Sequence, residues 1–237
     1  MSTQPPAVPS DSLVRIQALD AAEAAAGDAG ESWLTAQESA RLQAITAPQR
    51  RRQYLAGHWL LRQLAAQACG GEPARWRFAA GPDPRPRLAC EGLPPLWASL
   101  SHSGDRVAAA VARQPIGLDL EQPRRSRDLV ALANFLFAPE EAATVEGATE
   151  GLARSAVFYT LWTLKEARGK RSGEGLQPAQ ARRVAARPCA PAEAEAWHWA
   201  LPEQGSLALA AWPGLAPRVE GLPTGTQASA WRYLPLD

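Results

Sequence analysis

The sequence predicts an α+β fold made of two similar halves, because the same order of helix and strand patterns occurs twice. In the first half, helical patterns over 35–69 precede strand patterns over 97–121. In the second half, helical patterns over 127–171 precede strand patterns over 197–234. A length of 237 residues fits one large domain or two small ones.

We expect the halves to be two pseudo-twofold-related subdomains, each an antiparallel meander packed on helices. The turn Gln114-Pro115 gives an N-terminal half of residues 1–114 and a C-terminal half of residues 115–237. No residue-level repeat accompanies this shared order. Clefts between domains are common ligand sites, so we expect the site between the halves.

The N-terminal half begins with a short strand, and the rest of residues 1–30 is expected to be loop. Thr35-Ala36-Gln37-Glu38 is a capping box that opens a helix to about Ala47. The other predicted elements are a strand over 14–19, a helix over 49–69 that Gly70-Gly71 ends, and a short strand near 76–78.

A meander is expected next, over residues 97–121. Ser103-Gly104-Asp105 is a tight turn between two strands, and Gln114-Pro115 turns the chain into a third strand, Ile116–Glu121. This arrangement would bring His102 to the same end of the sheet as the third strand. Alone, a histidine in such a turn is more often a capped turn residue than a ligand, and its place beside the acidic strand makes the two roles about equally expected.

The strand Ile116–Glu121 has one apolar and one acidic face. Its apolar residues alternate with Gly117, Asp119 and Glu121. Strand geometry places the Cβ atoms of Asp119 and Glu121 roughly 6–7 Å apart on one face. One cation fits between the two carboxylates, although such a pair is more often a solvated sheet edge.

A long helix over 151–171 carries the third carboxylate. Glu166 and Lys170 are four residues apart and share a helix face, a spacing that more often gives a surface ion pair. Taken with the acidic strand, this pair suits magnesium and a phosphate: carboxylates bind the metal and the ammonium binds the phosphate. Carboxylates without cysteine or clustered histidine favour magnesium over zinc.

Composition narrows the class of protein. A hydrophobic share of 46% and a charged share of 21% are ordinary for a soluble globular chain. A net charge of +1 argues against a general nucleic-acid binder, and the cluster Arg50-Arg51-Arg52 is either a solvated turn or a local phosphate site. Three widely spaced cysteines suit a reducing cytosol. We find no signal-peptide pattern and no apolar stretch long enough to span a membrane, so we expect a cytoplasmic protein.

Together, these segments resemble the 4′-phosphopantetheinyl transferases of the Sfp-like group. That family carries an acidic strand of the form (I/V)-G-(I/V/L)-D-x-E followed by a helix W-(T/S)-x-K-E-(A/S)-x-x-K, and Asp119 and Glu166 mark these two motifs here. The other matching segments are Tyr54–Gly57 with Leu60-Leu61-Arg62, Arg85-Pro86, Ser101-His102-Ser103, Phe135–Glu141 and Gly173–Leu176. The motifs cover roughly residues 35–180.

The resemblance implies an enzyme that moves the phosphopantetheine arm of coenzyme A onto a serine of an apo acyl or peptidyl carrier protein. The reaction releases 3′,5′-ADP and uses magnesium, with manganese as a possible substitute. The resemblance implies that Asp119, Glu121 and Glu166 hold the metal. Glu166 is also the candidate base, directly or through a metal-held water.

The resemblance also assigns the basic residues. Lys170 would contact the phosphate. Lys165 is the other lysine of the helix motif. The resemblance places it with Glu166 and Lys170 among the catalytic residues, and also among the coenzyme A contacts. Ser101 and His102 would hold the pyrophosphate. The candidates for the 3′-phosphate and adenosine end are Arg52, Arg62 and Arg85, with Arg41 as a weaker one.

Two positions depart from the family pattern. Arg168-Gly169 stands where bulkier apolar residues are usual, and glycine in a helix costs about 1 kcal/mol relative to alanine. Arg85 replaces the usual lysine before proline, which keeps the charge but changes the phosphate geometry.

The carrier protein is expected to dock near Arg127–Phe137, because Arg124, Arg125 and Arg127 cluster there and carrier domains are acidic. We expect a monomer. Two other hypotheses stay open: a module that binds coenzyme A or a carrier without efficient transfer, and a magnesium enzyme acting on another diphosphate. The intact acidic residues argue against the first, and the motif order argues against the second.

Overall fold

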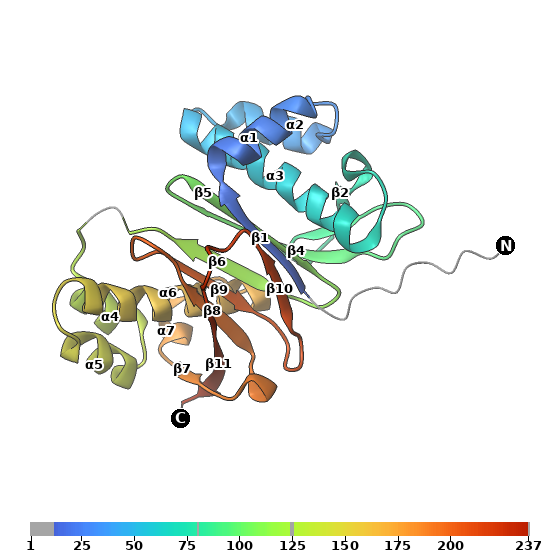
Figure 1. Ribbon diagram of the computed structural model, residues 1–237. Coiled ribbons are helices and arrows are strands. Elements are labelled where there is room, and N and C mark those ends of the chain that lie inside the picture. The colour runs from blue at the N-terminus through green and yellow to red at the C-terminus, as the bar shows by residue number, and fades with distance from the viewer. Residues whose placement is uncertain (1–11, 80, 124–125, 237) are drawn as a thin grey trace.

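A computed structural model describes residues 12–79, 81–123 and 126–236. Figure 1 shows helices α1, α2 and α3 above one sheet, and a second sheet below it with α4, α5 and α6 at its side. This arrangement confirms the predicted mixed α+β class.

The first part of the chain starts with a strand, continues with α-helices and ends with a series of strands. Its elements are β1 (Ser12–Ala18), α1 (Leu19–Asp28), α2 (Ala36–Ala44), α3 (Pro48–Cys69), β2 (Arg77–Phe78), β3 (Arg87–Ala89), β4 (Leu96–Ser103) and β5 (Arg106–Ala112). The Thr35 side chain accepts the Glu38 N–H and Glu38 accepts the Thr35 N–H, so the predicted capping box is present.

The second part begins with the acidic strand. Its elements are β6 (Gly117–Glu121), α4 (Leu129–Leu136), α5 (Pro139–Gly147), α6 (Leu152–Ser172), α7 (Pro178–Ala181), β7 (Val184–Pro188), β8 (Ala196–Ala200), β9 (Ser206–Ala210), β10 (Pro217–Glu220) and β11 (Ala228–Pro235). Short 3₁₀ turns lie at Pro73–Arg75 and Pro191–Glu193.

The segment Leu19–Asp28 is a helix, so the prediction of loop there was wrong. It contains many alanines, which favour helix more than any other residue. Leu19, Ala22 and Ala26 are buried. The composition of this segment therefore already carried the signal for a helix.

The strands of the described residues form two sheets. The first has the order β10-β1-β5-β4-β3-β2 and the second β6-β9-β8-β11-β7. Most neighbours are antiparallel, but β10 pairs with β1 in parallel. Residues 217–220 of the C-terminal half thus belong to the first sheet, and the pseudo-twofold relation between the halves stays a prediction.

Strand β6 does not complete the expected meander with β5. It pairs with β9 and begins the second sheet. Gly117 lets β6 pass directly over α6: a Cβ atom there would lie 1.9 Å from the Ala167 carbonyl oxygen and 2.5 Å from the Arg171 nitrogen. The glycine therefore brings the acidic strand against the helix that carries Glu166 and Lys170.

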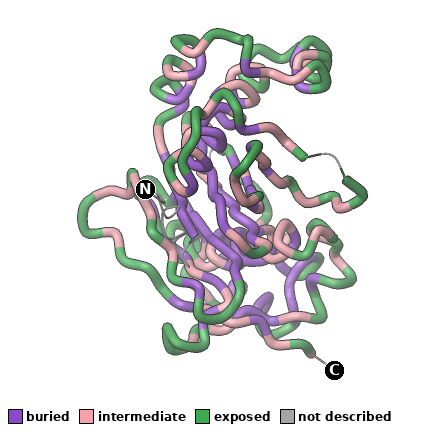
Figure 2. Tube along the Cα trace, turned by 90° about the vertical axis from the view of Figure 1, so that its right-hand side faces the viewer, coloured by how far each residue is buried: buried purple, intermediate pink, exposed green. Residues whose placement is uncertain are grey.

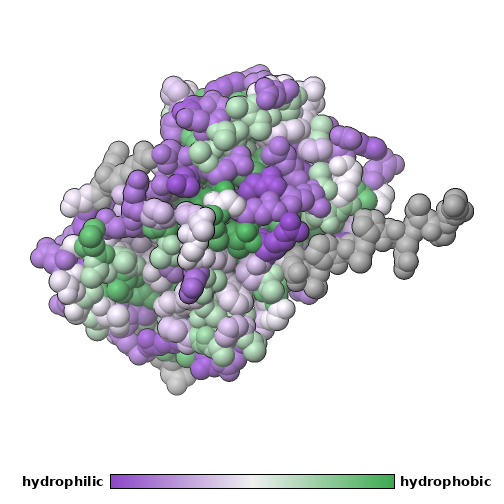
Figure 3. Space-filling model, in the orientation of Figure 1, coloured by the Kyte–Doolittle hydropathy of each residue, from purple (hydrophilic) through white to green (hydrophobic). Residues whose placement is uncertain are grey.

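Three clusters of apolar side chains form most of the core. One lies under α3 and a second between α6 and the second sheet. The third joins the two sheets, with Val14 and Ile16 from β1 packed near Leu118 and Leu120 from β6. In Figure 2 the buried residues run along the central strands. Figure 3 shows apolar surface across the middle of one face, with hydrophilic residues above and around it.

Candidate functional site

The centre of the site is the contact between Asp119 on β6 and Lys170 on α6. The Lys170 ammonium lies 2.8 Å from Asp119 Oδ1, 2.9 Å from the Leu118 carbonyl oxygen and 3.2 Å from Ser101 Oγ. An ammonium has three N–H donors, so each has a protein partner. Ser101 also donates to Asp119 Oδ1 at 3.0 Å. The structure thus brings Ser101, Asp119 and Lys170 together from three elements.

The three predicted metal ligands influence one another electrostatically. Burial raises the pKa of Glu121, and the charge of Asp119 raises it further. Burial also raises the pKa of Glu166, with Asp119 and Glu121 adding to the effect and Lys170 opposing it. Concentrated negative charge in a partly buried place favours a bound cation.

The residues present fit a magnesium site that water and substrate phosphates complete, and not a metal site built from protein ligands alone. Among the described residues, no three His, Cys, Asp or Glu side chains converge into a complete ligand set. Magnesium keeps several waters and is often held by one or two carboxylates plus substrate phosphates, so a complete set is not required. Asp119 Oδ2 is buried and has no hydrogen-bond partner in the described part of the chain. This orphaned oxygen is the strongest indication of a cation.

A basic cavity lies on the N-terminal side of this centre. It has a volume of about 480 Å³ and is lined by Arg41, Arg50, Gln53, Tyr54, Leu100 and His102, among others. Burial lowers the pKa of His102, and the nearby charges of Lys170 and Arg50 lower it further. His102 therefore lies close enough to Lys170 for the charge of the lysine to act on the imidazole.

A second cavity continues from the first. It has a volume of about 330 Å³, shares His58 and Leu100 with the first cavity, and reaches Arg85 and Lys170. Arg85 bonds to Asp83 and donates to the Arg171 carbonyl oxygen at 3.3 Å, and its guanidinium lies 4.6 Å from the centre of the Trp97 ring. Arg85 thus lines the same connected space as Lys170.

Arg52 and Arg62 do not line these cavities. Arg52 is held at the surface by Asp20 and Glu23. Arg62 is fully buried, bonds to both oxygens of Glu38, and stacks on Trp33. Both guanidinium groups already have carboxylate partners, so the geometry gives no support to a coenzyme A contact by either.

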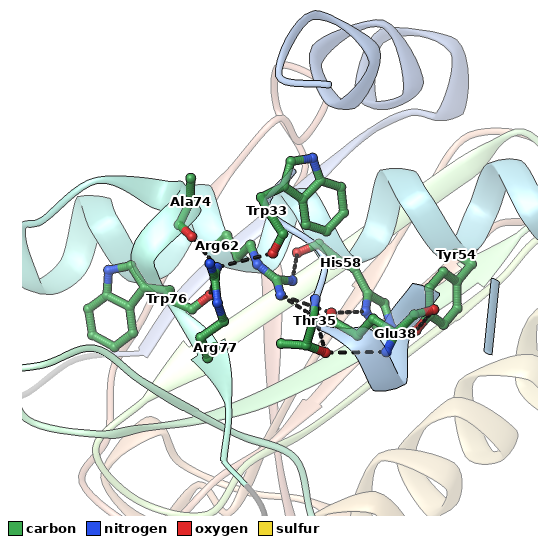
Figure 4. Close-up of polar contacts among 9 residues, drawn as sticks. All are labelled: Trp33, Thr35, Glu38, Tyr54, His58, Arg62, Ala74, Trp76 and Arg77. Atoms are coloured by element: carbon green, nitrogen blue, oxygen red, sulfur yellow. Dashed lines mark hydrogen bonds and ion pairs between the residues drawn. The ribbon is translucent and has the colours of Figure 1, made fainter. Parts of the chain in front are cut away.

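Glu38 is the hub of a buried polar network in the N-terminal half (Figure 4). It accepts from Thr35, from His58 Nδ1 at 2.9 Å and from Arg62 at 2.7 and 2.9 Å. Burial alone would raise the pKa of Glu38, but hydrogen bonds from His58 and Thr35 and the charge of Arg62 lower it to about 2. The network fixes α2 against α3, whose side chains line the basic cavity.

This network predicts acid sensitivity. The native state binds the Glu38 proton more weakly than the unfolded chain, so the ionised carboxylate adds on the order of 3 kcal/mol to the free energy of unfolding at neutral pH. That contribution is full above the unfolded pKa of 4.5 and is lost as pH falls toward 2. Urea unfolding of the wild type and Glu38→Gln should show the gap between them narrowing across this range. Parallel pH curves would contradict the assignment.

Lys165 lies in the core of the C-terminal half and not with the acidic residues of the site. Its ammonium contacts Glu141 at 2.8 Å and the carbonyl oxygens of Ala181 and Val184 at 2.8 and 2.6 Å. Burial lowers the pKa of Lys165, and the charge of Glu141 opposes this. All three donors bind protein groups, so the geometry gives no support to a catalytic or coenzyme A contact.

Gly169 has a steric reason to depart from the family pattern. A Cβ atom there would lie 2.5 Å from the Gly175 carbonyl oxygen. The Gly169 carbonyl oxygen accepts the N–H groups of Gly173 and Gly175. The glycine thus lets the loop after α6 pack on the turn that carries Lys170.

The predicted carrier-docking segment is only partly described. Arg127 is exposed and Phe135 is 60% exposed, while Arg124 and Arg125 lie outside the described residues. Docking there stays a prediction.

Sequence reasoning named Arg50 only within the cluster Arg50-Arg51-Arg52 and assigned no ligand contact to Tyr54 or His58 of the basic cavity. Arg50, Tyr54 and His58 share one face of α3, at the spacing expected of helical neighbours. This spacing can be seen in the sequence. The same helical pattern, however, also permits the neighbouring faces, which carry Arg51, Arg52 and Arg62, to line a cavity. Only the packing of α3 shows which face lines the cavity.

None of the helices that the structure describes is long and apolar enough to cross a membrane.

The sequence is similar to those of known proteins. The model of the 4′-phosphopantetheinyl transferase superfamily matches residues 115–211. The 4′-phosphopantetheinyl transferase HetI of Nostoc sp. is 31% identical over 211 residues, 84% of this chain and 83% of the relative. The 4′-phosphopantetheinyl transferase of Bacillus subtilis is 33% identical over 122 residues, 52% of each chain. AcpT of Escherichia coli is 34% identical over 133 residues, 54% of this chain and 62% of the relative. The chain therefore belongs to the 4′-phosphopantetheinyl transferase superfamily.

Proposed function

We propose that this protein transfers the 4′-phosphopantetheine arm of coenzyme A to a serine of an apo acyl or peptidyl carrier protein and releases 3′,5′-ADP. The observation that carries the proposal is the contact of Lys170 with Asp119, whose buried Oδ2 has no hydrogen-bond partner among the residues that the structure describes. Basic cavities next to this contact suit a phosphate-rich substrate.

We assign the metal to Asp119, Glu121 and Glu166. When bound, magnesium supplies positive charge that neutralises the diphosphate, and manganese can take its place. Lys170 would exchange one of its present protein acceptors for a phosphate oxygen. Its charge then offsets the negative charge that develops on the leaving 3′,5′-ADP.

The transfer needs one proton acceptor and one bond exchange. The serine oxygen forms a bond to the phosphorus that carries the pantetheine, and the bond from that phosphorus to 3′,5′-ADP breaks. We assign the proton of the serine hydroxyl to Glu166, which is partly exposed beside Lys170 on the same face of α6. His102, Arg50 and Arg85 line the cavities that would hold the coenzyme A phosphates.

We further propose a cytoplasmic monomer. The three cysteines are free, which suits a reducing compartment.

The test is the intact mass of an apo carrier protein after incubation with this protein, coenzyme A and magnesium. We expect the carrier to gain the mass of one phosphopantetheine arm, and the gain to vanish with a chelator. A carrier with its acceptor serine replaced by alanine is the matched control. No gain on several unrelated carriers, with coenzyme A still bound, would favour a binding module. Turnover of ATP in place of coenzyme A would favour a different diphosphate enzyme.

A further inference from the structure

The strands β4 and β6 lie side by side in different sheets and are joined by serine side chains. Leu118, Leu120 and Gln122 donate their backbone N–H groups to the hydroxyl oxygens of Ser99, Ser101 and Ser103, at 2.8, 3.1 and 3.0 Å. Successive serines on one strand face are two residues apart, and so are the N–H groups on one edge of a strand. We call these three hydroxyls the serine seam.

The serine seam supplies hydrogen-bond acceptors to β6, the edge strand of the second sheet. A buried backbone N–H needs an acceptor, and β6 is an edge strand with one side unpaired by β9. A shift of β6 along β4 by one residue would break all three bonds at once and turn its carboxylates to the other face. The seam therefore fixes the register of the acidic strand against the strand that carries His102.

Two of the three hydroxyls also hold a carboxylate. A hydroxyl can accept and donate at the same time. Ser101 donates to Asp119 Oδ1 at 3.0 Å, and Ser103 donates to Glu121 Oε2 at 3.1 Å. Among the described residues, Ser99 hydrogen-bonds to neither carboxylate.

The serine seam leaves the two carboxylate oxygens of Asp119 in different surroundings. Oδ1 is held by Ser101 and Lys170, which leaves Oδ2 buried and without a partner in the described part of the chain. Ser101 Oγ uses both of its acceptor positions, for the Leu120 N–H and Lys170, and its single proton for Asp119. Its geometry is that of a group holding Asp119 and not of one free to bind pyrophosphate.

We propose that Ser101 and Ser103 are positioning residues that aim Asp119 and Glu121 at the metal. This inference rests on the proposed function, because that function supplies the metal. A group that orients a ligand typically changes metal affinity by 10- to 100-fold when removed.

The test measures Mn²⁺ binding by electron paramagnetic resonance in the presence of coenzyme A. We expect Ser101→Ala and Ser103→Ala to bind Mn²⁺ at least about 10-fold more weakly than the wild type. Ser99→Ala is the comparison variant: it loses a seam bond but no carboxylate contact, so its Mn²⁺ affinity should fall less than that of Ser101→Ala or Ser103→Ala. Ser103→Thr keeps the hydroxyl and should restore the affinity. Thermal unfolding of each variant reports the structural cost of the lost seam bond separately.

The outcomes separate this inference from the proposed function. Equal Mn²⁺ affinity in all three alanine variants, or no Mn²⁺ binding by the wild type, would overturn the positioning role. If Ser101→Ala fails to fold, Ser101→Cys keeps the volume with a weaker hydrogen bond and serves in its place. Failure of the wild type to modify any carrier would refute the proposed function, while the ranking of Mn²⁺ affinities would still decide the role of the serines.

Discussion

Replacing Glu166 with Gln is expected to lower kcat/KM for arm transfer by about 10³-fold, because the amide cannot take the proton of the carrier serine. The substitution preserves size and one oxygen ligand. Glu166 is only partly exposed and close enough to Asp119 and Glu121 for their charges to raise its pKa. Initial rates of carrier modification, read by intact mass over a range of coenzyme A concentrations, measure the change.

A matched control separates the role of Glu166 from a general effect of lost charge. Glu146 is an exposed carboxylate on α5, and Glu146→Gln should transfer at the wild-type rate. A Glu166→Gln variant that retains wild-type kcat/KM would remove Glu166 from the reaction. A loss of Mn²⁺ affinity without loss of rate at saturating metal would leave it as a ligand but not as the base.

The sequence is enough to predict how the candidate residues lie within their own elements. Alternation of apolar and acidic residues is enough to place Asp119 and Glu121 on one face of a strand, and helical spacing is enough to place Glu166 beside Lys170. Both patterns depend only on residues within one element. The prediction of helices and strands over most of the chain is confirmed for the same reason.

Contacts between elements were harder to predict. The sequence around Gln114-Pro115 suggested a continuous meander, but β6 leaves β5 and starts a second sheet. That choice depends on Gly117, whose missing side chain admits the backbone of α6. Nothing in the local pattern shows which distant helix will fill that space.

The arginines show the same limit. A guanidinium can bind either a phosphate or a carboxylate, and sequence does not tell which partner lies nearby. Arg62 forms an ion pair with Glu38, and Arg52 forms ion pairs with Asp20 and Glu23. Because these carboxylates are distant in sequence from the arginines, the sequence does not show that they will meet. Arg50 and Arg41 face the cavity because of how α2 and α3 pack.

Replacing Lys165 with Met is expected to lower the free energy of unfolding by about 3–5 kcal/mol, because it leaves Glu141 as a buried carboxylate without its cation. Glu141 keeps the N–H groups of Ala138 and Ala186, at 2.9 and 2.7 Å, but these carry no full charge. The carbonyl oxygens of Ala181 and Val184 also lose their donor. Urea unfolding at neutral pH measures the loss.

Lys170→Met, on the same helix, gives the contrast that decides between the two lysines. The Lys170 side chain is 32% exposed, against 3% for Lys165, so its loss should cost less stability while abolishing most transfer. Adding Glu141→Gln to Lys165→Met should recover part of the lost stability, since the unpaired charge is then removed. Unchanged stability with lost transfer in Lys165→Met would instead return Lys165 to the reacting groups. The family motif contains both lysines at fixed spacing, yet their side chains lie in different surroundings: Lys165 pairs with Glu141 in the core, and Lys170 pairs with Asp119 of the acidic strand.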